Sequence, residues 1–212
     1  MIKVKTFVFN LFNENTFVVR DQESGEGMII DPGCCNQKEE NELADYILSK
    51  EIKIKYIINT HCHIDHIFGN TFTKEKYKAE FLVPEDDVFL LDMMIDEAKN
   101  FGVGFVPSPE PDGFLTEDLE LKIGDSKMKF IFTPGHSPGE FSVLFEESKI
   151  CFTGDVLFRE SIGRTDLWNG NQWDLFDSIN NKLFKLDDDV KIYPGHGPVS
   201  TIGHEKLHNP FL

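Results

Sequence analysis

The first half of the chain alternates short apolar runs with amphipathic segments, which predicts a mixture of strands and helices. Three runs with apolar residues at alternate or successive positions predict an antiparallel meander of strands: Val4–Phe9, Thr16–Arg20 and Met28–Ile30. Residues 36–50 carry apolar side chains at helical spacing, and the apolar run at residues 56–60 predicts a buried strand after this helix. The order strand, helix, strand predicts a β-α-β step.

The remainder of the chain continues this alternation. Helices are predicted at 71–78, 86–99 and 172–186, and a proline-containing loop is predicted at 102–113. Further strands are predicted from apolar runs at 81–83, 119–123, 128–133, 141–145, 150–153 and 191–193. Two β-rich halves, each followed by helices, predict an α/β (α+β) fold in which two sheets pack face to face with helices outside.

Composition narrows the class of protein. A chain of 212 residues with 40% apolar residues is typical of a single globular domain, here residues 1–212. The net charge of −16 disfavours nucleic acid and anionic membrane surfaces as partners, so a small-molecule substrate is expected. No run approaches the roughly 18 apolar residues of a membrane helix, and the N-terminus lacks the apolar run of a signal peptide, so we expect a cytoplasmic protein.

The four cysteines form no disulfide framework and are interpreted as reduced structural thiols. Cys62 stands between two histidines, and the surrounding sequence favours neither a packed nor an exposed thiol.

The strongest chemical motif is His61-Cys-His63-Ile-Asp65-His66, which directly follows the strand predicted at 56–60. Imidazole nitrogens and a carboxylate oxygen are ligands that suit Zn²⁺, Fe and Mn²⁺. Alternation at 61, 63 and 65 would direct these side chains the same way from an extended loop, and His66 would open the next helix. The motif therefore predicts a metal site.

Three further segments have the same design, in which an apolar strand and a Pro or Gly turn precede one potential ligand: His136, Asp155 and His196. Such turns bring side chains together at one edge of a sheet. Asp31 also follows an apolar strand, and it is a candidate both for orienting a histidine N–H and for capping its own turn. His204 and His208 lie outside these motifs and are interpreted as structural or surface residues.

In the order of these motifs the sequence resembles the metallo-β-lactamase superfamily over nearly its whole length. Within it, the segments around His136, Asp155, Gly163-Arg-Thr-Asp and His196 resemble the glyoxalase II (hydroxyacylglutathione hydrolase) branch. The resemblance implies a four-layer αβ/βα sandwich. It also implies a metal site of two Zn²⁺ ions, with Fe or Mn as alternatives. His61, His63 and His136 would hold the first ion, Asp65, His66 and His196 the second, and Asp155 would bridge them.

The same resemblance implies an enzyme that hydrolyses an ester, thioester or amide with hydroxide generated between two metal ions, with Asp65 and Asp155 as catalytic residues. A small thioester, such as an S-acylglutathione, is favoured because a thiolate can leave without a dedicated general acid. β-Lactamases proper carry Cys in place of Asp155, which disfavours antibiotic hydrolysis. Full-length glyoxalase II enzymes continue into a helical glutathione-binding domain, which we do not expect in a chain that ends at Leu212.

A mononuclear-iron persulfide dioxygenase of the same superfamily is the alternative function, because it shares the ligand pattern. Arg164 is a candidate clamp for a substrate carboxylate, and an ion pair with Asp166 or Asp174 is the alternative role for this arginine. Tyr193 is a second candidate substrate contact. The oligomeric state is not predicted.

Overall fold

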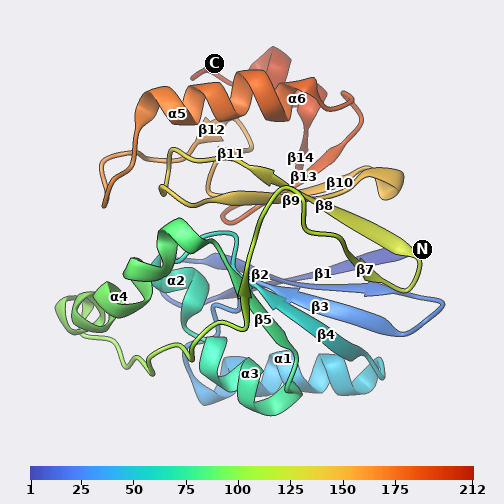
Figure 1. The fold of residues 1–212 in the computed structure, drawn as a ribbon, viewed down its shortest axis with the longest axis vertical. Coiled ribbons are helices and arrows are strands. Elements are labelled where there is room, and N and C mark those ends of the chain that lie inside the picture. Colours follow the sequence, from blue (N-terminus) through green and yellow to red (C-terminus); the bar gives the residue numbers. More distant parts are fainter. The chain divides into compact units, whose positions relative to one another are not determined.

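The computed structural model describes residues 1–212 and divides them into two compact units (Figure 1). The first unit comprises Met1–Phe114 with Lys122–Ser126, and the second comprises Leu115–Leu121 with Lys127–Leu212. None of the helices is long and apolar enough to cross a membrane.

A six-stranded sheet forms the centre of the first unit, in the order β1-β2-β3-β4-β5-β6. Its strands are β1 (Ile2–Phe9), β2 (Glu14–Asp21), β3 (Glu26–Ile30), β4 (Lys53–Ile58), β5 (Glu80–Val83) and β6 (Gly113–Phe114). The pairs β1–β2 and β2–β3 are antiparallel, which confirms the predicted meander. From β3 to β6 the neighbouring strands are parallel, which confirms the predicted β-α-β step.

The helices of the first unit are α1 (Gln37–Ser49), α2 (Ile64–Ile67), α3 (Asn70–Tyr77) and α4 (Val88–Phe101), with a 3-10 turn at Glu85–Asp87. Asn36 caps α1 by accepting a hydrogen bond from the backbone N–H of Glu39. Leu43 and Ile47 of α1 are buried. Figure 1 shows α1 and α3 on the same side of this sheet, so both helices cover one of its faces.

The second sheet has the order β14-β13-β10-β9-β8-β7. Its strands are β7 (Leu121–Ile123), β8 (Ser126–Phe132), β9 (Phe141–Phe145), β10 (Ile150–Gly154), β13 (Lys191–Pro194) and β14 (Ser200–Thr201). A separate hairpin consists of β11 (Leu157–Phe158) and β12 (Ser161–Ile162). The parallel pairing of β10 with β13 brings the ends of these two strands together.

The helix predicted at 172–186 consists of three successive helical forms. It begins as α5 (Gln172–Asp177), continues as a π-helical turn (Ser178–Lys182) and ends as a 3-10 turn (Leu183–Lys185). Leu175, Ile179 and Leu183 are completely buried and pack in one cluster with Ile192 of β13. The spacing of four residues keeps the apolar face toward the sheet through the change of helical form. The last helix, α6 (Ile202–His208), contributes Ile202 to the same cluster.

The predicted α/β class is confirmed, and the differences are local. The strand predicted at 119–123 starts only at Leu121. The sequence did not predict four strands of two residues each, β6, β11, β12 and β14, or the seven-residue helix α6. A strand of two residues is too short to show a periodic pattern of apolar positions. Such strands form by pairing with a neighbouring strand that the sequence does not reveal.

Candidate metal centre

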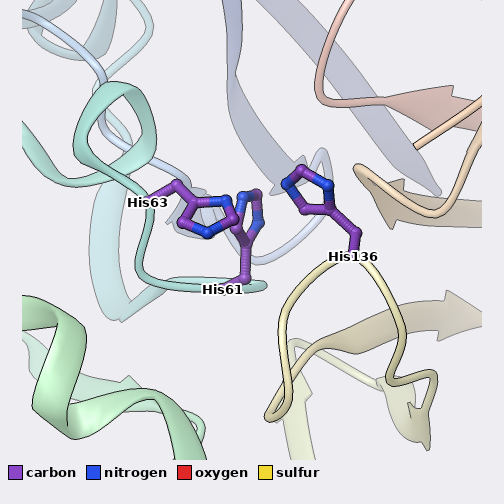
Figure 2. A group of neighbouring side chains, drawn as sticks. All are labelled: His61, His63 and His136. Atoms are coloured by element: carbon purple, nitrogen blue, oxygen red, sulfur yellow. The ribbon is translucent and has the colours of Figure 1, made fainter. Parts of the chain in front are cut away.

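Four of the predicted ligands form one group in the first unit, which we call the N-terminal ligand group: His61, His63, Asp65 and His66. They follow β4, with His61 and His63 in the loop before α2 and Asp65 and His66 within α2, and the imidazole rings of this group are buried. The rings of His61 and His63 meet edge to face with centroids 4.8 Å apart (Figure 2). The ring of His61 lies 4.1 Å from that of His66, and Nε2 of His66 lies 3.7 Å from Oδ2 of Asp65. The side chains of this motif thus lie close together, as predicted.

The position of Asp65 differs from the sequence expectation. An extended loop through residue 65 was expected, with His66 opening the helix, and this is wrong because α2 already starts at Ile64. Asp65 therefore lies in the first turn of α2, where the helix dipole favours a carboxylate. The amide of Asn10 donates a hydrogen bond to the backbone carbonyl of Asp65 at 3.0 Å, which ties this turn to the loop after β1.

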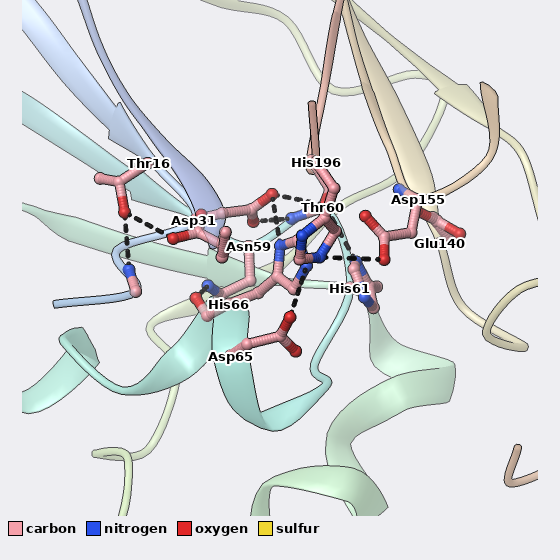
Figure 3. A network of polar contacts seen from close by, with 12 residues as sticks. Thr16, Asp31, Asn59, Thr60, His61, Asp65, His66, Glu140, Asp155 and His196 are labelled. Carbon is pink, nitrogen blue, oxygen red and sulfur yellow. Dashed lines mark hydrogen bonds and ion pairs between the residues drawn. The ribbon is translucent and has the colours of Figure 1, made fainter. Parts of the chain in front are cut away.

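Asp31 supports this group from the end of β3 (Figure 3). One carboxylate oxygen accepts the backbone N–H of Thr60 at 2.7 Å, and the other accepts its hydroxyl at 2.7 Å. Oδ2 of Asp31 also lies 3.2 Å from Nδ1 of His66. Asp31 therefore faces a histidine ring, as one of its two predicted roles requires, and its carboxylate holds the backbone at Thr60 rather than capping its own turn.

Thr60 determines the protonation of His61. Its single hydroxyl proton is donated to Asp31, so the hydroxyl oxygen, which lies 3.2 Å from Nδ1 of His61, is left to accept a proton. Nδ1 of His61 accordingly carries the hydrogen, and Nε2 presents the lone pair that a metal needs.

The other three predicted ligands form the C-terminal ligand group in the second unit: His136, Asp155 and His196. Each follows the end of a strand, β8, β10 or β13, as predicted. Oδ2 of Asp155 lies 3.5 Å from Nε2 of His136 and 3.5 Å from Nε2 of His196. The ring of His136 is drawn in Figure 2 at the end of the loop that follows β8.

The turns of the C-terminal ligand group depend on close backbone contacts. Gly135 has a φ of 140°, and a side chain there would come within 2.3 Å of the backbone of Leu175. The backbone N–H of Asp155 donates a 2.6 Å hydrogen bond to the buried carboxylate of Glu140 (Figure 3). These contacts hold His136 and Asp155 at the sheet edge.

Arg164 and Tyr193, the predicted substrate contacts, lie in the second unit. The guanidinium of Arg164 donates two hydrogen bonds to Asp166, at 2.6 and 2.8 Å, and this pairing lowers the pKa of Asp166 to about 2. The structure therefore has the ion pair that was considered as the alternative to a substrate clamp. Tyr193 lies on β13 with its ring 5.3 Å from that of Phe152, and burial raises the pKa of its hydroxyl.

Three buried carboxylates near the ligand groups were not singled out from the sequence: Glu14, Asp87 and Glu140. Burial raises the pKa of Glu14 well above its usual value, and Thr16 donates its hydroxyl to this carboxyl at 2.9 Å. Asp87 accepts the backbone N–H of Cys62 at 3.1 Å. Asp87 and Glu140 each bond a backbone N–H distant in sequence, 25 and 15 residues away, so no local motif identifies them.

Cys62 itself is buried, and burial raises the pKa of its thiol well above the usual value. Only one of the two roles considered for it, the packed thiol, agrees with this burial.

The chemistry of the donors fits divalent metal ions. Two donors bound to one tetrahedral Zn²⁺ at about 2.1 Å each lie roughly 3.4 Å apart. The 3.5 Å separations around Asp155 match this spacing, and they are too long for good hydrogen bonds. Neutral imidazoles and carboxylates are also the ligand types that Zn²⁺, Fe and Mn²⁺ share.

Comparison with known proteins finds similarity along most of the chain. The family described as "Metallo-beta-lactamase superfamily" matches residues 10–196. The hydroxyacylglutathione hydrolase GloC of Haemophilus influenzae is 36% identical over 203 residues, which cover 95% of this chain and 93% of that protein.

Two solved structures are similar over the whole fold. The B3 metallo-β-lactamase BLEG-1 matches with a TM-score of 0.90 and 31% identity, covering 100% of this chain and 99% of that one. TTHA1623, solved in a di-iron-bound form, matches with a TM-score of 0.88 and 30% identity, covering 99% and 100% of the two chains. The predicted fold is therefore confirmed.

Proposed function

The chain belongs to the metallo-β-lactamase superfamily, and we propose that it is a metal-dependent hydrolase that cleaves a small thioester. The observation that carries the proposal is the grouping of Asp155 with two histidine nitrogens, each 3.5 Å from one of its oxygens. A carboxylate with such neighbours is suited to bind a cation, because each donor supplies a lone pair at metal-ligand spacing.

Both ligand groups would serve one binuclear centre. We assign His61, His63 and His136 to the first ion and Asp65, His66 and His196 to the second, with Asp155 shared between the two. The assignment follows the family pattern residue by residue, and the convergence of the donors within each unit supports it. Zinc is the first choice, and the di-iron form of TTHA1623 supports iron as the alternative.

The metal ions, when bound, supply a Lewis acid for the thioester carbonyl and make a water molecule acidic enough to attack it at neutral pH. The protein residues orient the reacting groups. Thr60 keeps the proton of His61 on Nδ1, and Asp31 places a negative charge beside Nδ1 of His66, which makes both rings better ligands.

Asp65 is the proposed proton carrier. Its side chain is 13% exposed, whereas the ring of His66 beside it is completely buried. A carboxylate with access to solvent can take up the proton of the attacking water and release it again. The leaving thiolate needs no further acid, because the pKa of a thiol is only about 8.5.

The name of the Haemophilus relative supports an S-acylglutathione as the substrate. Its identity of 36% is shared along almost the whole of both chains, so the same class of substrate is the first to test.

The decisive experiment is hydrolysis of S-lactoylglutathione by freshly purified protein, with zinc, iron and manganese counted in the same sample. We expect turnover that is lost on chelation and about two metal ions per chain. A cephalosporin is included because BLEG-1 is a β-lactamase, and we expect no cleavage of it. No thioester turnover in protein that holds about one iron per chain would contradict the proposal and favour persulfide oxidation by O₂.

A further inference from the structure

The second unit contains a depression of about 310 Å³ that the assigned roles do not use. Arg159, Lys191, Tyr193, Thr201 and His204 are among the residues that line it. The depression therefore combines cationic side chains with hydroxyl groups, although the whole chain carries a net charge of −16.

The two arginines of this part of the chain differ in their partners. Arg164 is engaged by both carboxylate oxygens of Asp166, as described above. Arg159 has only a loose contact with Glu160, with 3.8 Å between its Nε atom and Oε1. Glu160 is in turn bonded to Nε2 of His204 at 2.9 Å, so its charge is shared with the histidine. The guanidinium of Arg159 thus retains donors for a further anion.

Lys191 adds a second positive charge, because its exposed ammonium has no acidic partner. The remaining lining residues are mixed in character and include Tyr193, Val199 and Thr201. A carboxylate carried on a short methylene chain matches these walls, since its charge meets the cations and its carbon atoms meet the apolar surfaces.

The depression shares the chain segment of β13 with the C-terminal ligand group. Tyr193 stands three residues before His196 on the chain segment that leads to this ligand. Phe158, the neighbour of Arg159, has its ring 6.2 Å from that of His196 and nearly perpendicular to it. The depression and His196 are thus connected through β13 and through the β11–β12 hairpin, which carries Phe158 next to Arg159.

We propose that this depression binds a carboxylate of the thiol carrier, with Arg159 as the anchoring residue and Lys191 and Tyr193 as further contacts. This inference rests on the thioesterase function proposed above and narrows its substrates to thioesters of acidic thiols. Arg159 replaces Arg164 as the proposed contact for the substrate carboxylate, because the guanidinium of Arg164 is already paired with Asp166.

The test compares two substrates that share the lactoyl group, S-lactoylglutathione and the uncharged S-lactoyl-N-acetylcysteamine. In Arg159→Gln with Lys191→Gln we expect the KM for the glutathione ester to rise at least about tenfold, because both charged contacts are lost. The KM for the neutral ester and both kcat values should stay within about twofold, because the reacting centre is untouched.

The matched control is Lys185→Gln, which removes a charge from an exposed position of the second unit. A rise in KM that occurs equally for both substrates would overturn the inference. The inference would also be overturned if the KM for the glutathione ester rose selectively in Arg164→Gln and not in the double variant.

A binding measurement keeps this inference separate from the proposed function. S-Methylglutathione, which cannot be hydrolysed, is titrated into isotope-labelled protein while the backbone amide signals are followed by NMR. Signals of residues 158–160 and 191–204 should move in the wild type and not in the double variant. Wild-type protein that binds in this way but hydrolyses neither ester would refute only the thioesterase function. Shifts confined to other residues would refute the carboxylate site.

Discussion

Nδ1 of His136 lies 2.7 Å from the backbone carbonyl oxygen of Arg164. A carbonyl oxygen can only accept a proton, so Nδ1 must carry the hydrogen and donate it. The Nε2 atom, which faces Asp155, is then left with its lone pair. The importance of Arg164 in this structure therefore lies in its main chain, which orients a predicted ligand, as much as in its side chain.

This arrangement depends on the small size of Gly163. A Cβ atom at this position would come within 1.9 Å of the backbone carbonyl oxygen of Asp155 and within 3.2 Å of Cβ of His136. We expect Gly163→Ala to lower the free energy of unfolding by about 1–3 kcal/mol, the usual cost of overpacking, and to weaken metal binding. Urea denaturation and metal competition measure the two effects. Gly104→Ala is the control, since no atom lies within 4 Å of that site, and equal stability of both variants would contradict the prediction.

Asp155→Ala should lose one equivalent of bound metal and more than about a hundredfold of kcat, a larger loss than substitutions outside the ligand set usually cause. The physical reason is that this carboxylate approaches two imidazole nitrogens within the same group. Metal analysis and steady-state kinetics on one preparation check both losses. Asp174→Ala, in the exposed part of α5, provides the comparison. A variant that keeps both its metal content and its rate would end the bridging assignment.

Asp31→Asn tests the support of the N-terminal ligand group. Asn tolerates the φ of 49° at this position and can still accept the N–H of Thr60, but it has no charge to place beside His66. We expect a roughly 10- to 100-fold lower affinity for zinc, measured by competition with a chromophoric chelator. Asp86→Asn, at an exposed position, should bind zinc like the wild type. An unchanged affinity in the Asp31 variant would limit this residue to holding the backbone at Thr60.

Glu14 predicts a dependence of stability on pH. Burial raises its pKa in the folded state well above the value of 4.5, so above that pH the folded protein binds more protons at this site than the unfolded chain does. The contribution of Glu14 to the free energy of unfolding therefore falls as pH rises, by up to about 1.4 kcal/mol per pH unit. Glu14→Gln mimics the protonated acid and removes this loss.

The measurement is urea denaturation of both proteins at about pH 5 and about pH 8. The free energy of unfolding of Glu14→Gln, relative to that of the wild type, should be higher at the upper pH than at the lower one. The exposed control Glu42→Gln should show no such trend. A difference that is independent of pH would mean that Glu14 is ionised in the folded protein.

The cysteines should differ sharply in reactivity. Cys34, Cys62 and Cys151 are buried, and burial raises the pKa of each thiol, to about 12 for Cys151. Cys35 is the one cysteine with partial exposure. Because the thiolate is the reactive form, a thiol reagent should modify one cysteine in the native protein and all four in denaturant. Cys35→Ser should abolish the native reaction, and rapid native modification of Cys62 would contradict the packed position found for it.

By itself, the sequence determined the elements and the ligand candidates that depend on local pattern. An apolar run followed by a Pro or Gly turn is a local signal, and it correctly placed His136, Asp155 and His196 at strand ends. The β-branched and apolar runs of the meander and the helical spacing in α1 are local signals of the same kind, because the period of a segment reflects the face that it buries.

Only the tertiary structure decided which partners these residues meet. It paired Arg164 with Asp166 and left Arg159 beside the depression, it placed Glu140 against the backbone of Asp155, and it began α2 early enough to include Asp65. Each of these outcomes depends on how packing positions the turns, and the bond between Glu140 and Asp155 spans 15 residues. Hydrogen bonds across many residues leave no period and no spacing in the chain, so the sequence alone cannot indicate them.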